Sequence, residues 1–353
     1  MTRRNFVQSA AVMPLTLAAM EAPGIPQAFA QAADPYSTDP YSYVDPELAV
    51  PLRKYPPIPT PTAQNLAAMR AADTNSLVMS EPELQPRKMT IPGPAQMSDV
   101  TVLVVDPKPE QKGRPAVIYM HGGGFILGHA ETNLRLLQKA AQATGAYTVS
   151  VDYSLAPEAR FPVAMEQCYA TLAWLHRNSA RLGIDPTRIA VMGDSAGGLH
   201  AACLTIAARD RREFPIAYQC LLYPALDDRT GSTRRLPPSM GHFLATPEYV
   251  RFAWSALLGK SAGTASSPPG AVPARVKDLS GLPPAFIGVG SIDLFCDEDI
   301  GYARRLALAG VSTELFVVPG AYHGFDIVAP QAKLTLQFYN AWQNALRRGL
   351  GLA

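Results

Sequence analysis

The sequence predicts an α/β protein with a mainly parallel central sheet and helices on both faces. From about residue 100 onward, short apolar, β-rich segments alternate with longer segments whose apolar residues recur at helical spacing. Several of the β-rich segments end in glycine or another turn residue. The chain has 353 residues, 48% of them hydrophobic, which is enough for a sizeable core. Such alternation is typical of a parallel sheet in which ligands bind beyond the carboxyl ends of the strands.

The expected elements follow the chain in order. Strands are expected at 100–106, 115–123, 147–153, 188–194, 217–225, 283–291 and 313–320. Helices are expected at 131–144, 161–183, 196–210, 297–310 and 331–349. Many of the 33 prolines lie in the first 110 residues and between 215 and 285, so irregular structure or short helices are expected there.

Charge and cysteine content restrict the class of partner. The chain has 31 basic and 29 acidic residues, a formal net charge of +2 and no basic stripe. We therefore expect no nucleic-acid partner and a small, mostly uncharged ligand. The four cysteines form no CxxC pair and no Cys/His cluster, so the sequence predicts neither a metal site nor a cofactor. Cys168, Cys203 and Cys220 are expected to be buried thiols, whereas the role of Cys296 stays open.

The first 30 residues are similar to an export signal. Arg3 and Arg4 precede a modest apolar run, and an Ala-Phe-Ala triplet that ends at Ala30 has the form of a cleavage site. The start is similar to bacterial twin-arginine signals, with Gln8 where lysine is common. The apolar run is too short to span a bilayer, so no stable membrane anchor is expected. We expect removal of residues 1–30 and a periplasmic or secreted protein; the alternative is an ordinary amphipathic helix.

The stretch VMGDSAGG, residues 191–198, carries the candidate nucleophile. It follows a β-rich run and precedes a helical one, so Ser195 lies on a strand-to-helix turn. Gly193, Ser195 and Gly197 form the G-x-S-x-G pattern, in which glycines leave room for a sharp turn that exposes the serine. The start of the following helix would also direct N–H groups toward a developing anion. This context favours a nucleophile over a serine that only caps a helix.

Two segments are expected to form an oxyanion hole. Ala196 follows the serine directly, and YMHGGGFILG at 119–128 supplies a glycine-rich loop at a strand end. Gly123 and Gly124 can present N–H groups without a Cβ that blocks the substrate, and each such donor contributes roughly 3–4 kcal/mol at the transition state. His121 is expected to brace this loop. The alternative of a phosphate-binding loop would need a Lys-Ser/Thr pair that is missing here.

The base and its orienting acid are expected in loops that end later strands. His323 follows the last β-rich run in VVPGAYHGFD, and Asp293 ends the run before it in AFIGVGSID. The chain order serine, acid, histidine is that of one class of serine hydrolases. His323 would take the Ser195 proton, and Asp293 would orient the imidazole and stabilise its cation. The acidic residues at 297–299 are rivals, but they are expected to be N-terminal charges of the next helix.

These blocks together resemble the hormone-sensitive-lipase-like family of α/β-hydrolases, the bacterial family IV carboxylesterases. HGGG at 121–124, GDSAGG at 193–198 and YHGF at 322–325 fit the signature blocks of that family. DLFCDE at 293–298 is similar to the family's DPLRDE. The match covers roughly residues 90–353 and implies the α/β-hydrolase fold.

A further block of the resemblance is DYSLAPE, which starts at Asp152 and is similar to the family's DYRLAPE. Ser154 stands where arginine is usual. The resemblance implies that Asp152 and Glu158 are structural and tie together loops near the site.

The resemblance also implies a helical cap over the strand ends. It would consist of an N-terminal cap segment, residues 31–85, and an insertion near 226–265 within a catalytic domain that covers 86–353. The insertion is rich in bulky apolar side chains. The residues expected to line the substrate pocket are Phe125, Met240, Phe243, Leu244 and Trp254.

The sequence therefore predicts a serine carboxylesterase that cleaves small carboxylic esters through an acyl-enzyme intermediate. One alternative is the same triad acting on lactones, amides such as arylformamides, or carbamates. Another, of a different class, is a non-catalytic small-molecule receptor on the same fold, as in plant gibberellin receptors. Such a receptor would be expected to lack the histidine, so the presence of His323 favours an enzyme.

Overall fold

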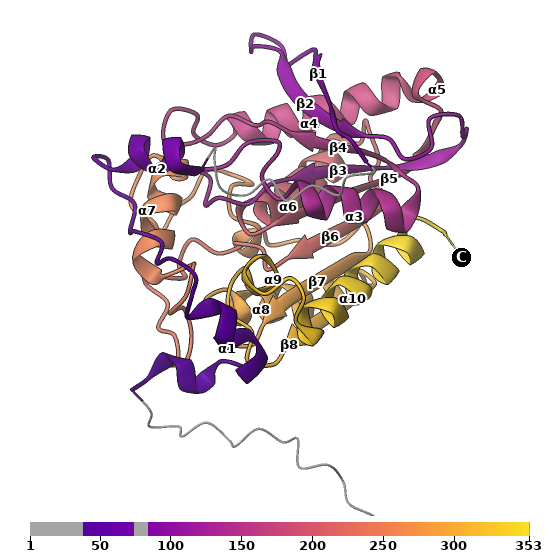
Figure 1. Ribbon diagram of the computed structural model, residues 1–353. Coiled ribbons are helices and arrows are strands. Elements are labelled where there is room, and N and C mark those ends of the chain that lie inside the picture. The colour runs from indigo at the N-terminus through magenta and orange to yellow at the C-terminus, as the bar shows by residue number, and fades with distance from the viewer. Residues whose placement is uncertain (1–37, 74–83, 353) are drawn as a thin grey trace, which may run out of the picture.

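An eight-stranded sheet organises the molecule, and its strands match the expected order of elements (Figure 1). The strands are β1 (Arg87–Ile91), β2 (Val100–Val105), β3 (Arg114–Met120), β4 (Tyr147–Val151), β5 (Ile184–Asp194), β6 (Tyr218–Leu222), β7 (Ala285–Gly290) and β8 (Thr313–Val318). The structure is a computed structural model that describes residues 38–73 and 84–352. The order across the sheet is β1-β2-β4-β3-β5-β6-β7-β8. β2 pairs antiparallel with β1 and β4, and the other neighbours pair parallel, which confirms the mainly parallel sheet.

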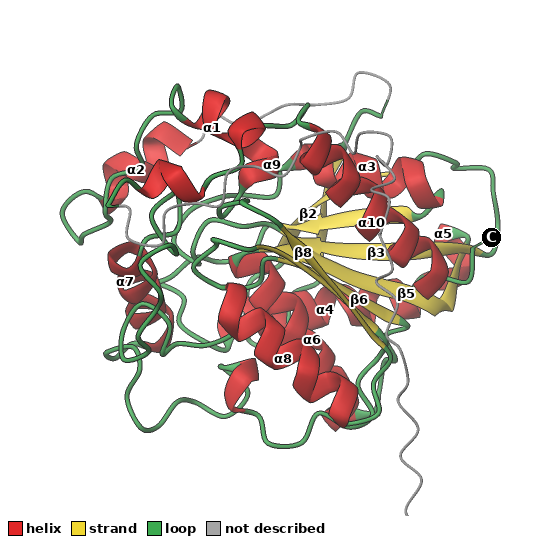
Figure 2. Cartoon of the chain, turned by 90° about the horizontal axis from the view of Figure 1, so that it is seen from below, coloured by secondary structure: helices red, strands yellow, loops and turns green. Residues whose placement is uncertain are grey.

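Helices cover both faces of this sheet (Figure 2). The main ones are α3 (Leu134–Thr144), α4 (Val163–Arg177), α6 (Ala196–Arg211), α8 (Cys296–Leu308) and α10 (Lys333–Gly349). α3 and α10 lie together on one face, and α4, α6 and α8 lie on the other. Phe338 and Trp342 of α10 are fully buried on the first face, where removal of one such aromatic side chain costs about 3–5 kcal/mol. The sheet, packed on both faces, thus supports the loops at the carboxyl ends of its strands.

Three elements differ from the expectations. β1 is an additional edge strand. It was not expected because its exposed Arg87 and Lys88 interrupt the apolar pattern of a buried strand. The helix expected at 161–183 ends at Arg177 because Asn178 turns back and its Nδ2 donates to the Trp174 carbonyl at 2.8 Å. A separate short helix, α5 (Ser179–Leu182), follows.

Further helices gather beyond the carboxyl ends of the parallel strands, at one end of the sheet in Figure 2. They are α1 (Pro46–Leu52), α2 (Leu66–Asp73) and α7 (Pro247–Leu258). α2 is tied to the loop after β4, because Arg70 forms an ion pair with Glu158 at 2.9 Å and donates to the Ala156 carbonyl at 2.7 Å. In the same region Asp152 Oδ1 accepts the Ala130 N–H at 3.0 Å. Asp152 and Glu158 therefore join loops near the strand ends.

Two of the remaining expectations concern the leader and the cysteines. The expected export signal, residues 1–30, lies outside the described residues. Within the described ranges, no helix is both long and apolar enough to cross a membrane. All four cysteines are buried free thiols. Cys296 opens α8, and burial raises the pKa of its thiol to about 12.

Candidate active site

Ser195 occupies a strained turn between β5 and α6. Its backbone φ is 53° and its ψ is −118°, a conformation that is unfavourable for a residue with a side chain. Its N–H donates to the Leu222 carbonyl at 2.9 Å, which attaches the turn to β6. Ser195 is one of the residues that line a pocket at the carboxyl ends of the strands. The strained turn is therefore the expected way to present a reactive hydroxyl.

The glycines around Ser195 are required by close packing. A Cβ on Gly193 would lie 2.2 Å from the Gly197 carbonyl oxygen, and a Cβ on Gly197 would lie 2.0 Å from the Met120 carbonyl oxygen. Real Cβ atoms do not approach backbone so closely. The two glycines therefore let β3, β5 and α6 converge beneath the serine.

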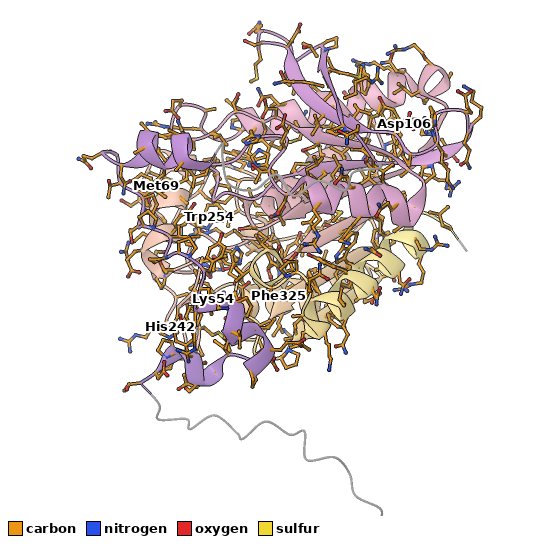
Figure 3. The ribbon with its side chains drawn as sticks, viewed as in Figure 1. Lys54, Met69, Asp106, His242, Trp254 and Phe325 are labelled. Atoms are coloured by element: carbon orange, nitrogen blue, oxygen red, sulfur yellow. The ribbon has the colours of Figure 1, made fainter. Side chains whose placement is uncertain are left out.

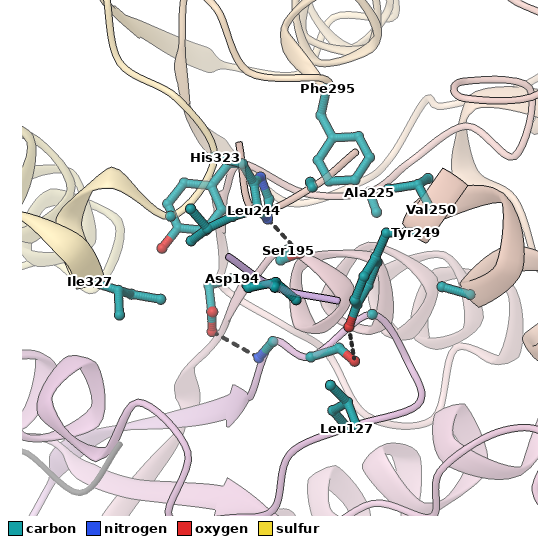
Figure 4. Close-up of a pocket in the computed structure, with 18 of the residues that line it drawn as sticks. Leu127, Asp194, Ser195, Ala225, Leu244, Tyr249, Val250, Phe295, His323 and Ile327 are labelled. Atoms are coloured by element: carbon teal, nitrogen blue, oxygen red, sulfur yellow. Dashed lines mark hydrogen bonds between the residues drawn. The ribbon is translucent and has the colours of Figure 1, made fainter. Parts of the chain in front are cut away.

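His323 and Asp293 reach Ser195 from loops that follow β8 and β7. His323 Nε2 lies 2.9 Å from Ser195 Oγ (Figure 4), and His323 Nδ1 lies 2.8 Å from Asp293 Oδ2. Asp293 is 1% exposed, and its Oδ1 accepts the Phe295 N–H at 2.9 Å. Because an ionised carboxylate only accepts hydrogen bonds, Nδ1 is the donor and Nε2 is left to accept the serine proton. The structure thus brings together the three residues that the sequence predicted as nucleophile, base and acid.

The glycine loop after β3 lies beside Ser195. Gly123 has a φ of 118° and Gly124 a φ of 60°, both in the region that favours glycine, and both line the same pocket. Ala196 is the first residue of α6, so its N–H has no acceptor within the helix. The three N–H donors expected for an oxyanion hole are therefore grouped around the serine.

His121 supports this loop, as expected. Its Nδ1 lies 2.7 Å from the Gly122 carbonyl oxygen, and its ring stacks on Tyr153 with ring centroids 4.1 Å apart. The Tyr153 hydroxyl donates to the His121 carbonyl at 2.6 Å. Burial lowers the pKa of His121 to about 4, so the ring is neutral at physiological pH.

Asp194 connects the serine turn to the glycine loop, a role that the sequence did not reveal. Its Oδ1 accepts the Gly122 N–H at 3.1 Å and the Tyr119 hydroxyl at 2.5 Å, and its Oδ2 accepts Asn133 Nδ2 at 3.0 Å. Burial raises the pKa of Asp194. Its place directly before the serine was visible in the motif, but its partners lie more than 60 residues away. Asp194 thus fixes the distance between the two segments that are expected to form the oxyanion hole.

The acidic residues that follow Asp293 do not replace it. Asp297 is exposed and forms an ion pair with Arg234 at 2.9 Å. Glu298 is buried, and its Oε1 accepts the backbone N–H of Leu226 at 2.5 Å. Asp299 is fully buried. All three lie in the first turn of α8, as expected, but burial raises the pKa of Glu298 and Asp299 well above the usual range and so disfavours their charged forms.

The structure corrects part of the expected substrate pocket. Phe125 and Leu244 line the pocket, but Met240, Phe243 and Trp254 are not among its lining residues. Phe243 instead packs on Tyr41 and Tyr322, with ring centroids 5.0 and 5.7 Å away, and Met240 packs against the same core.

Trp254, which was expected to line the pocket, belongs to the core instead. It is fully buried and contacts Phe125 with ring centroids 5.1 Å apart, so it supports a lining residue from behind. Its indole fills the core beneath α7 rather than the pocket.

Several lining residues were missed by sequence reasoning. Tyr249, Val250 and Ala253 of α7 line the pocket, and Figure 4 labels the first two of them on one side of it. Tyr55 and Ile58 contribute from the N-terminal segment. The ring of Tyr249 lies so close to Gly124 that a Cβ there would be 2.6 Å from Tyr249 Cε1. The helical spacing of the three α7 residues was a usable signal, but most of this helix is apolar, so its inward face was ambiguous.

No group of three or more histidine, cysteine or acidic side chains that could hold a metal ion occurs within residues 38–73 and 84–352. The pocket contains few ionisable groups besides Asp194, His323 and the tyrosines. Its lining is mostly aliphatic and aromatic, as is usual for a site that binds a small apolar molecule.

Known proteins share this fold and much of this sequence. A family model described as the α/β hydrolase fold matches residues 117–327. The carboxylesterase NlhH of Mycobacterium tuberculosis is 38% identical over 259 residues, which are 71% of this chain and 79% of the relative. An ethyl acetate hydrolase of Pseudomonas putida is 33% identical over 60% of this chain and 65% of its own length. Among solved structures, a bacterial heroin esterase superposes with a TM-score of 0.77 at 34% identity and covers 88% of this chain and 99% of its own.

Proposed function

Because the chain belongs to the hormone-sensitive-lipase-like branch of the α/β-hydrolases and is a carboxylic ester hydrolase, we propose that it cleaves small carboxylic esters through an acyl-enzyme on Ser195. One observation carries the proposal: Ser195 Oγ, His323 and Asp293 form a continuous hydrogen-bonded chain, 2.9 and 2.8 Å long at its two links, at the base of an apolar pocket. That geometry is the requirement for a serine activated by a base whose orientation is fixed by an acid.

The proposed reaction has two halves. Ser195 Oγ attacks the acyl carbon while His323 Nε2 takes the hydroxyl proton, and the carbonyl oxygen becomes an anion facing the N–H groups of Gly123, Gly124 and Ala196. The imidazolium then gives its proton to the alkoxide as the ester C–O bond breaks. Water repeats the sequence on the acyl-enzyme and releases the acid. Asp293 holds the tautomer and stabilises the cation in both halves.

The direction of proton transfer also assigns the two sides of the pocket. The leaving oxygen must lie near His323 Nε2, so the alcohol group would occupy the side that carries Leu244 and Ile327 (Figure 4). The acyl chain would then extend toward Tyr249 and Val250 of α7. We infer on this basis that α7, with α1 and α2, acts as the cap.

Covalent labelling tests the acyl-enzyme directly. A fluorophosphonate should modify the protein at one residue, and mass spectrometry of the digest should place the adduct on Ser195. A hydrolysis panel of p-nitrophenyl esters, lactones, arylformamides and carbamates then separates the reaction classes. Labelling at another serine, or a lactone or amide hydrolysed faster than every ester, would overturn the proposal.

We also propose that the protein is exported by the twin-arginine route, since Arg3 and Arg4 precede an apolar run and an Ala-Phe-Ala triplet. Expression of the full chain in a bacterial host should give mature protein that begins near Gln31 outside the cytoplasm. Replacement of both arginines by lysine should retain it inside. An intact N-terminus on envelope-associated protein would contradict this.

A further inference from the structure

Two aromatic rings pack against the imidazole of His323. The ring centroid of Tyr223 lies 5.0 Å from that of His323 at an interplanar angle of 73°, and the ring centroid of Phe295 also lies 5.0 Å away at 87°. Both are edge-to-face contacts, which aromatic rings prefer. The imidazole is therefore confined by neighbours other than Asp293 and Ser195.

Tyr223 is held in an unusual backbone conformation. It follows β6 directly, has a φ of 36° and is 1% exposed. Its N–H donates to the Gly288 carbonyl of β7 at 2.6 Å. A non-glycine residue in this region is strained. Such strain persists only where the surrounding structure over-determines the conformation, and it is concentrated at active sites. The position of the Tyr223 ring is thus built into the sheet.

The Tyr223 hydroxyl is anchored by a second buried carboxyl group. It donates to Asp326 Oδ1 at 2.8 Å. Asp326 lies three residues after His323 in the chain and is 1% exposed. Its Oδ2 has no hydrogen-bond partner among the described residues. Burial raises the pKa of Asp326 to about 6, whereas the Tyr223 hydrogen bond and the charge of His323 lower it. Asp326 is therefore mostly ionised at neutral pH, close enough to His323 for the two charges to interact.

We propose that Tyr223 and Asp326 are positioning residues for His323: the Tyr223 ring holds the imidazole, and the Asp326 carboxylate adds a second buried negative charge that stabilises the imidazolium. This rests on the role of His323 as the base proposed above. Coupling between two sites is reciprocal. The positive charge of His323 favours the ionised form of Asp326, so ionised Asp326 favours the protonated form of His323 by the same free energy. Asp293 sets the tautomer, and Asp326 adds charge stabilisation without contacting the substrate.

The other groups around Asp326 do not cancel this effect. The facing tyrosines all have a pKa raised by burial and stay neutral in ester assays; they are Tyr119, Tyr223, Tyr322 and Tyr339. Arg135 and Lys139 of α3 lie over the Tyr339 ring, at 5.5 and 5.1 Å from its centroid. Asp194, whose pKa burial raises, is the other carboxyl group that interacts with both Asp326 and His323.

The first test measures the proton affinity of His323 by NMR titration in the inactive Ser195→Ala background. Asp326→Asn keeps an acceptor for the Tyr223 hydroxyl but cannot carry charge. We expect the proton affinity of His323 to fall about tenfold, because a nearby opposite charge is lost. An unchanged titration of His323 in a folded Asp326→Asn protein would overturn the proposal.

The second test compares pH profiles of kcat/KM with Ser195 intact. Asp326→Asn removes a negative charge near His323, so the acidic limb of the profile should move to lower pH, and kcat at pH 8 should fall about tenfold with little change in KM. Tyr223→Phe should give the same change to a smaller extent, and it keeps the test valid if Asp326→Asn does not fold.

A matched control uses the other tyrosine that contacts Asp326. The Tyr339 hydroxyl donates to the Asp326 backbone carbonyl at 3.1 Å, so Tyr339→Phe removes a buried hydroxyl without touching the carboxylate. Its pH profile should match the wild type. If Asp326→Asn, Tyr223→Phe and Tyr339→Phe all lower only thermal stability, the positioning role is refuted while the esterase stands. Hydrolysis that survives Ser195→Ala would instead refute the proposed function.

Discussion

The floor and the roof of the pocket are built by different interactions. The floor consists of Ser195, Asp293, His323 and the glycine loop at 122–124, and hydrogen bonds of 2.8 to 2.9 Å hold its reactive side chains at the ends of parallel strands. The roof is α7, whose position depends on apolar contacts of Trp254 and its neighbours. Figure 3 labels Trp254. The inward residues of α7 contribute volume and shape.

Under the proposed function, the floor fixes the chemistry and the roof selects the substrate. A catalytic group must be held to within about 0.5 Å, which strand ends and hydrogen bonds can achieve. A wall of the pocket only has to exclude or admit methylene groups, each worth about 0.8 kcal/mol. Changes in the floor should therefore abolish the reaction, and changes in the roof should alter which esters react.

The largest effect is expected in the floor. Ser195→Ala and His323→Ala should each lower kcat by a factor on the order of 10⁴–10⁶, and the double variant should lose little more, because the residues act as one unit. Asp293→Asn should lower kcat by about 10⁴, because it presents the wrong tautomer. Steady-state hydrolysis of p-nitrophenyl acetate measures all of these.

Asp297→Asn is the matched control for the acid, since this exposed carboxylate pairs with Arg234 rather than with His323. It should leave kcat within about twofold, as expected for a surface pair. A larger loss from Asp297→Asn than from Asp293→Asn would mean that the acid is misassigned.

Trp254→Ala should weaken the roof without removing the reaction. The indole is fully buried and supports Phe125, so its removal should cost roughly 3–5 kcal/mol in the free energy of unfolding. Denaturant unfolding measures this cost, and Trp342→Ala on the far face of the sheet is the control for a buried tryptophan remote from the pocket. Loss of reactivity as large as that of Ser195→Ala in folded protein would break the distinction between floor and roof.

Ester selectivity should follow the volume under α7. We expect kcat/KM to rise up to acyl chains of about four to six carbons and to fall at least about tenfold by about twelve, since overfilling a packed wall costs about 1–3 kcal/mol. Val250→Ala should move the optimum to longer chains, and Ser255→Ala on the same helix, outside the pocket lining, should not. Efficiency that still climbs for the longest chains would reject a closed pocket.

The smallest effect concerns a buried carboxyl group outside the floor. Neither oxygen of Asp299 has a hydrogen-bond partner in the described part of the chain, and burial raises its pKa well above the usual range. The folded state therefore keeps a proton that the unfolded state releases, so this residue lowers stability increasingly as pH rises above the unfolded value of about 4. Asp299→Asn should raise the melting temperature at pH 8 by a few degrees, and the gain should shrink toward pH 4. An equal gain at both pH values would contradict the raised pKa.

Much of the fold and the reactive residues could be inferred from the sequence because their signals are local. The G-x-S-x-G turn needs its glycines within two residues of Ser195, and the ends of β7 and β8 place Asp293 and His323 directly after apolar runs. The alternation of strand and helix patterns then implies that these loops meet at one end of the sheet. This conclusion requires no knowledge of contacts between residues that are distant in the sequence.

Only the tertiary structure decided what surrounds those residues. Two hydrogen bonds join segments more than 70 residues apart: that of Asp194 with Gly122 and that of Tyr223 with Asp326. The local sequence of one segment does not indicate which distant residue it contacts. α7 is apolar over much of its surface, so its sequence could not show that Val250 faces the pocket and Trp254 the core. The physical reason is that local propensity and turn chemistry depend on neighbours in the chain, whereas the partner of a buried side chain depends on how the completed layers pack.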